Sequence, residues 1–118
     1  MEISKVFIVK PEETAEFVGS GGLQVLATPM LIAYIENVCF EWLENELQDN
    51  ETSVGVHIEV SHLKPTKVSE KVNIVVDIIE KTDRKATFEC AAFQGEELIG
   101  TANHKRVIVD QSSFLKKL

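Results

Sequence analysis

The stretch TPMLIAYIENVCFEWLENEL, residues 28–47, decides the fold of this chain. It is the only run suited to a long helix. Thr28 and Pro29 open it, and these residue types are favoured as a helix N-cap and at the first helical position. We therefore predict that Thr28 caps a helix over residues 29–47, about 28 Å long at 1.5 Å per residue. Its first half is apolar on nearly every side, which is typical of a helix wrapped by a sheet.

Segments that alternate apolar and polar residues lie on both sides of this helix. One short strand is predicted at residues 5–10, and four more follow the helix, joined by short turns that make neighbours antiparallel. In the last segment, residues 98–109, the alternation blurs at Gly100, so its inward side is not assigned. In the other three, the predicted inward residues are Val54, Val56, Ile58 and Val60, then Val72, Ile74, Val76 and Ile78, then Ala86, Phe88, Cys90 and Ala92.

Five antiparallel strands curled around one helix make an α+β fold, the hot-dog architecture. The 118 residues provide enough core for one domain, which we place at residues 1–118. A flexible loop is predicted at residues 19–22, where glycine and serine cluster before the helix.

Composition and charge exclude several classes of function. Twelve basic and nineteen acidic residues give a net charge of −7, which disfavours nucleic acid and anionic membranes as partners. No apolar run reaches the ~20 residues of a membrane span, and the N-terminus does not resemble a secretion signal. Cys39 and Cys90 fall in apolar segments, as expected for reduced thiols in a cytoplasmic protein.

Two polar side chains are predicted on apolar surfaces. Glu36 lies in the apolar arc of the helix, so it should be paired, hydrogen-bonded or at the wall of a cleft. Alternatively, it reaches solvent at a helix crossing or meets a structural partner. His62 shares the predicted inward side of its strand, where it is either a core residue or a functional neighbour of Glu36.

The remaining candidates are weaker from the residues alone. The Thr28 hydroxyl would lie at the positive end of the helix dipole, where developing negative charge is stabilised, or would simply cap the helix. His57 is predicted to face outward, and the side of His104 is not assigned. No two histidines have metal-ligand spacing, so no metal site is predicted.

Several motifs, in order along the chain, resemble the fluoroacetyl-CoA thioesterase-like group of hot-dog thioesterases. They are Ala27-Thr28-Pro29-Met30-Leu31-Ile32-Ala33 with Ile35-Glu36, Glu51-Thr52-Ser53-Val54-Gly55, Ser61-His62-Leu63-Lys64-Pro65-Thr66, and Gly100-Thr101-Ala102-Asn103-His104-Lys105-Arg106. The resemblance implies hydrolysis of an acyl-CoA thioester, with CoA as part of the substrate and no other cofactor. It implies catalytic roles for Thr28, Glu36 and His62, and it places Gly55 near the reacting carbonyl and Arg106 at CoA. It also implies a homodimer with the active site at the subunit interface.

Departures from the group's pattern limit what carries over. Asn103 and Lys105 stand where threonine and glutamate are common, which changes the expected surroundings of Arg106. The segment from Gly19 to Leu23 lacks bulky aromatic residues, so fluoroacetyl selectivity is not expected. Because the net charge of −7 repels CoA, a local basic rim is predicted, with candidates Lys64, Lys67, Lys105 and Arg106.

The resulting hypothesis is a thioesterase for small or medium acyl groups. Glu36 activates a water or attacks the carbonyl itself, Thr28 orients the reacting group, and His62 polarises it or supplies the proton to the leaving thiolate. The sequence does not separate water attack from an acyl-enzyme path. The alternative is a non-catalytic acyl-CoA or small-lipid binding module on the same scaffold. A hydratase is disfavoured, because no hydratase-like motif is present.

Overall fold

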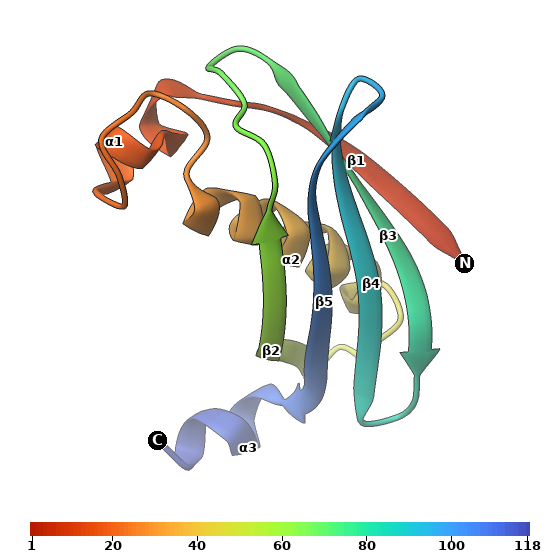
Figure 1. Ribbon diagram of the computed structural model, residues 1–118. Coiled ribbons are helices and arrows are strands. Elements are labelled where there is room, and N and C mark those ends of the chain that lie inside the picture. Colours follow the sequence, from red (N-terminus) through yellow and green to blue (C-terminus); the bar gives the residue numbers. More distant parts are fainter.

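The computed structural model describes all 118 residues and contains one five-stranded antiparallel sheet with the long helix against it (Figure 1). The order of the strands across the sheet is β1-β3-β4-β5-β2, so β1 and β2 are the edges. This arrangement confirms the predicted hot-dog architecture. The elements are β1 (Glu2–Ile8), the 3-10 turn η1 (Pro11–Glu13), α1 (Ala15–Val18), α2 (Thr28–Glu44), β2 (Glu51–His62), β3 (Lys71–Lys81), β4 (Lys85–Gln94), β5 (Glu97–Asp110) and α3 (Gln111–Lys116).

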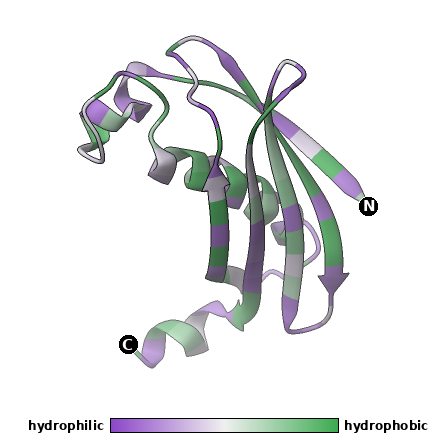
Figure 2. Ribbon diagram, in the orientation of Figure 1, coloured by the Kyte–Doolittle hydropathy of each residue, from purple (hydrophilic) through white to green (hydrophobic).

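The core lies between α2 and the sheet. Apolar and polar bands alternate along the strands (Figure 2), as expected where one face packs on a core and the other meets solvent. The predicted inward sides of β3 and β4 are confirmed. The fully buried side chains there include Val72, Ile74, Val76, Ala86, Phe88 and Ala92. No helix of the structure is both long and apolar enough to cross a membrane.

A β-bulge in β2 overturns part of the predicted alternation. The pairing of β2 with β5 shifts between Gly55 and His57, so one residue is left over and the strand reverses which face its side chains take. Val54 and Val56, both predicted inward, take the other face: Val54 pairs with Val107, next to the inward Arg106, and Val56 is 53% exposed, whereas Ser53 is buried before the bulge. After the bulge, Ile58 and Val60 pack against the core as predicted.

The inward side of β5, which the sequence left open, holds Gly100, Ala102, His104 and Arg106. Gly100 is required by close packing, because a Cβ there would lie 3.0 Å from Leu31 Cδ2 and 3.2 Å from the Ser61 carbonyl oxygen. Helix α2 therefore rests directly on β5. The same alternation carries an imidazole and a guanidinium into the interior.

The start of α2 differs from the prediction. Ala27 is the residue that precedes the helix, Thr28 is already helical, and no side chain caps the first turn. The helix ends at Glu44 rather than at residue 47. Backbone hydrogen bonds fix its entry, from the Leu26 N–H to the Thr66 carbonyl (2.8 Å) and from the Ala27 N–H to the Glu13 carbonyl (2.9 Å). The Thr28 hydroxyl is thereby left available for another partner.

Candidate active site

The first turn of α2 meets the end of β2 through a direct side-chain contact. Thr28 Oγ1 lies 2.7 Å from His62 Nδ1. Both residues line a pocket of about 300 Å³ between the end of β2 and the loop before α2. The other lining residues are Ala15, Ser20, Val25, Leu26, Leu63, Lys64 and Pro65. A hydroxyl, an imidazole and a helix N-terminus thus converge on one concave surface.

One ring nitrogen of His62 is hydrogen-bonded, and the other has no hydrogen-bond partner in the chain. Nδ1 contacts Thr28, and Nε2 is buried without a hydrogen-bond partner in the chain. Burial lowers the pKa of His62 below its ordinary value of 6.5, and the Lys64 backbone partly offsets that shift. The imidazole is therefore neutral at pH 7 and can exchange a proton with a bound group.

Glu36 lies near the middle of α2, where it faces β2 and β5. Its Oε2 is 3.6 Å from Arg106 Nη1 and 4.0 Å from His104 Nε2, and its side chain is 40% exposed. Gly55 lies against the same oxygen, since a Cβ at that position would be 2.8 Å from it. Glu36 thus has a cationic neighbour in Arg106 and keeps part of its side chain exposed, which fits both of the alternatives left open from the sequence.

Arg106 is held rigidly rather than exposed. Its Nε donates to Ser53 Oγ (2.8 Å), its Nη2 donates to the Ser53 carbonyl (3.1 Å), and its residue exposure is 6%. Its guanidinium also lies 5.6 Å from the centre of the Phe40 ring, a cation–π distance. Arg106 therefore does not belong to an exposed basic rim, and its expected contact with CoA stays a prediction.

Thr28 and His62 form one group of residues, and Glu36, His104 and Arg106 form a second. The two groups do not meet within one chain. Thr28 and Glu36 are eight positions apart on α2, which is about 12 Å along the helix. In the sheet, His62 pairs with Gly100 while Gly55 pairs with Arg106. No hydrogen bond or ion pair joins Glu36 to His62. Within one chain, therefore, Glu36 and His62 are not neighbours.

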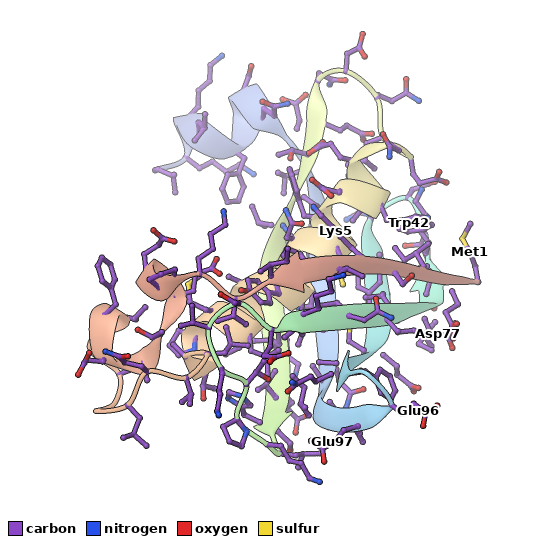
Figure 3. All side chains as sticks on the ribbon, turned by 90° about the horizontal axis from the view of Figure 1, so that it is seen from above. Met1, Lys5, Trp42, Asp77, Glu96 and Glu97 are labelled. Carbon is purple, nitrogen blue, oxygen red and sulfur yellow. The ribbon has the colours of Figure 1, made fainter.

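The predicted basic residues are spread around these two groups. Lys64 lines the pocket beside His62 and pairs at 2.8 Å with Glu97, the first residue of β5, which Figure 3 labels. Lys67 lines a neighbouring pocket of about 320 Å³ that shares Val25 and Pro65. Lys105 takes the opposite side of β5 from Arg106. These positions support Lys64 and Lys67 as rim residues near the Thr28–His62 pocket.

The expectation that Asn103 and Lys105 change the surroundings of Arg106 is wrong. Asn103 is exposed and Lys105 is half-buried, and both project from the outer face of the sheet. The outer face also carries a hollow of about 520 Å³ that includes Glu59, Glu89 and Asn103. It contains no histidine, and both Thr28 and Glu36 lie on the inner side of the sheet. His57 is exposed, as predicted, with its Nε2 3.6 Å from a carboxylate oxygen of Glu59.

Two residues near Glu36, namely His104 and Ser53, were not predicted from the sequence as site residues. His104 Nδ1 lies 2.8 Å from the His57 carbonyl, and Arg106 Nη1 lies 3.2 Å from His104 Nε2. Ser53 supplies two acceptors to Arg106. The spacing of His104 and Arg106, two apart in a strand, was the available signal, because it places both on one face.

Comparisons of the sequence with known proteins find a matching family and a related enzyme. Residues 9–112 match the family model described as fluoroacetyl-CoA-specific thioesterase. A fluoroacetyl-CoA thioesterase from Streptantibioticus cattleyicolor is 24% identical over 95 residues, which span 80% of this chain and 68% of that protein.

Solved structures share the fold over nearly the whole chain. A fluoroacetyl-CoA thioesterase structure superimposes with a TM-score of 0.92 at 22% identity, covering 99% of this chain and 91% of that one. A variant of that enzyme bound to fluoroacetate and CoA gives 0.90 at 22% identity, covering 97% and 96%. A thioesterase superfamily member from Thermus thermophilus gives 0.89 at 21% identity, covering 99% and 87%.

Proposed function

The chain belongs to the fluoroacetyl-CoA-specific thioesterase family, and we propose that it hydrolyses a small or medium acyl-CoA thioester to the free acid and CoA. The observation that carries the proposal is the Thr28–His62 hydrogen bond beside a pocket at the N-terminus of α2. The absence of bulky aromatic residues from Gly19 to Leu23 supports an acyl group other than fluoroacetyl.

The start of α2 suits a reacting thioester carbonyl. In the first turn of α2 the Met30 and Leu31 N–H groups both donate to the Ala27 carbonyl (3.0 Å each). Pro29 has no N–H, so the Thr28 N–H is the one left for a ligand, and the helix dipole adds positive potential there. A carbonyl oxygen bound in the pocket would gain negative charge as the tetrahedral intermediate forms, and the Thr28 N–H together with the helix dipole would stabilise it. The Thr28 hydroxyl would orient the reacting group, while the neutral His62 would first take up a proton released at the site, such as that of the attacking water, and then pass it to the departing thiolate of CoA.

Glu36 would enter this site from a second copy of the chain. Strand β2 is a twelve-residue edge strand without lysine or proline, the residues that commonly protect a free edge from pairing. Antiparallel pairing of two β2 strands about an axis near Ile58 and Glu59 would set His62 of one copy opposite Gly55 of the other. Because Gly55 lies against Glu36, each carboxylate would then adjoin the Thr28–His62 pair of the other copy.

In such a homodimer Glu36 would activate a water molecule or attack the carbonyl directly. The substrate's CoA moiety would lie along the Lys64 side of the pocket, where the Lys64 ammonium would turn from Glu97 to a CoA phosphate and so offset the net charge of −7 locally. The two cysteines are free and buried, which supports a reducing compartment such as the cytoplasm.

Thiol release from a panel of acyl-CoAs, with acyl chains from acetyl to about octanoyl, tests the proposal. The wild-type protein should release CoA from at least one of them, and Glu36→Gln and His62→Asn should each lower kcat by about a hundredfold or more. Glu41→Gln is the matched control, because Glu41 lies on the same helix but is exposed and pairs with Lys5 (2.9 Å). Release from none, with tight binding of one, would instead identify a non-catalytic acyl-CoA binder.

A further inference from the structure

The protonation state of His104 follows from its two hydrogen-bond partners. Nδ1 lies 2.8 Å from the His57 carbonyl, which can only accept, so Nδ1 carries the hydrogen. Nε2 lies 3.2 Å from Arg106 Nη1, which can only donate, so Nε2 is the acceptor. His104 is therefore the neutral Nδ1–H tautomer. It accepts from the guanidinium and forms no ion pair with Glu36.

The environment of His104 maintains that state. The side chain is almost fully buried and lies over the Phe88 ring, with centroids 6.1 Å apart. The charged and titratable groups that face it are Arg106 on its own strand, Glu36 on α2 and His57 on β2. Burial is the largest cause and lowers the pKa of His104. The hydrogen bond to the His57 backbone is the next largest and raises it, the Arg106 cation lowers it again, and Glu36 opposes with a smaller effect.

Arg106 Nη1 is shared between His104 and Glu36. Ser53 accepts hydrogen bonds from the other two guanidinium nitrogens, Nε and Nη2. The plane of the guanidinium and the acceptor on β5, His104 Nε2, then set the direction in which Nη1 points. In this orientation Arg106 Nη1 lies 3.6 Å from Glu36 Oε2. The bulge in β2 supports this arrangement in two ways. It turns Gly55 toward Glu36, and it lies next to the His57 carbonyl that fixes His104.

We propose that His104 is a positioning residue for the Glu36 carboxylate, acting through Arg106. As an acceptor, its Nε2 keeps the guanidinium aligned with Glu36, and the Nδ1–H bond to β2 keeps the imidazole itself in place. This role rests on the proposed function, in which Glu36 is the general base or nucleophile. It assigns no direct contact of His104 with the substrate.

Two amide variants separate the two hydrogen bonds of His104. In His104→Gln the amide oxygen can reach the former Nε2 position and accept from Arg106. In His104→Asn the shorter amide reaches only the former Nδ1 position and can donate to the His57 carbonyl. We expect His104→Gln to keep kcat within about threefold of wild type, and His104→Asn to lose about tenfold or more with KM within about twofold.

Thermal unfolding of both variants provides the control for a merely structural role. Equal losses of kcat in the two variants, or losses that simply follow their melting temperatures, would overturn the positioning role. A wild-type protein that releases no thiol from any acyl-CoA would overturn the proposed function instead, and a second measurement then decides the role of His104.

That measurement is ¹⁵N NMR of the imidazole and guanidinium groups, which needs no activity. The expected result is a protonated Nδ1 with an unprotonated Nε2 at pH 7. Arg106 should show resolved Nη signals in all three proteins, because Ser53 holds Nε and Nη2, and the Nη1 signal should keep its wild-type position in His104→Gln and shift in His104→Asn. A protonated Nε2, or Arg106 signals that are alike in both variants, would refute the proposal.

Discussion

Glu36 Oε2 occupies the space that a side chain on Gly55 would need. A Cβ built on Gly55 would lie 2.8 Å from that oxygen, 3.2 Å from His104 Cε1 and 3.4 Å from Arg106 Nη1. Real Cβ atoms do not approach a carboxylate so closely. The glycine therefore decides where the carboxylate of α2 rests against the sheet.

Gly55→Ala should lower kcat by about tenfold or more while the protein stays folded, because the added methyl group displaces the carboxylate from its place beside Arg106. Steady-state thiol release measures the effect. Gly22→Ala is the matched control, since a Cβ there meets nothing within 4 Å and the residue does not have a positive φ. If Gly55→Ala retained the wild-type kcat, the proposed place of Glu36 in the reaction would be wrong.

Mixing two inactive variants tests whether the site is assembled from two copies. Glu36→Gln and His62→Asn chains, unfolded and refolded together, should recover about a quarter of the wild-type rate. Half of randomly formed dimers are mixed, and each mixed dimer has one complete site of two. Each variant refolded alone is the control. Failure to recover activity, with mixed dimers demonstrated by mass spectrometry, contradicts a shared site.

Acidification should destabilise the fold before the carboxylates titrate. The pKa values of His62 and His104 lie below 6.5 in the folded protein, with burial as the main cause. As the pH falls below about 6.5 the unfolded chain binds more protons than the folded one, so the free energy of unfolding decreases. Urea unfolding at pH 7.5 and 5.5 measures this.

His104→Gln removes one of these two groups, so its unfolding free energy should change less between the two pH values than that of the wild type. A wild-type stability that stays constant or rises on acidification would be incompatible with two neutral, desolvated imidazoles.

Lys64→Glu should raise KM for acyl-CoA by about fivefold, which corresponds to about 1 kcal/mol, with little change in kcat. Lys64 is an exposed residue that lines the pocket, so the effect should shrink as salt screens it. Lys81→Glu makes the same charge change on an exposed residue at the end of β3. If both variants raise KM equally, the effect belongs to the net charge and not to a CoA contact.

The two cysteines should react slowly in the folded protein. Cys39 and Cys90 are buried, with sulfur atoms 3.9 Å apart across α2 and β4, and no disulfide joins them. The contact with Cys90 and burial both raise the pKa of the Cys39 thiol, which suppresses the reactive thiolate. An aromatic disulfide reagent should detect both thiols only after unfolding in urea. Immediate reaction of either thiol in native buffer would contradict this packing.

The local pattern of residues was sufficient for most of the fold. Burial on one side of a strand leaves a period of two in the sequence, and β3 and β4 follow it without interruption near the core. The apolar surface of α2 likewise required elements around it. His62 was placed on the correct side of β2 because the part of the strand that follows the bulge keeps its alternation.

The sequence alone determined the architecture, the inward position of His62 and the place of Glu36 in the apolar arc of the helix. Only the tertiary structure decided which partners these residues have. A bulge adds one residue without a signature in composition, so Val54 and Val56 were assigned to the wrong face. The Thr28 hydroxyl meets His62 rather than the backbone of its own helix, and Glu36 meets Arg106 rather than His62. Hydrogen bonds and ion pairs depend on registers between strands distant in sequence, and periodicity within one strand carries no information about those registers.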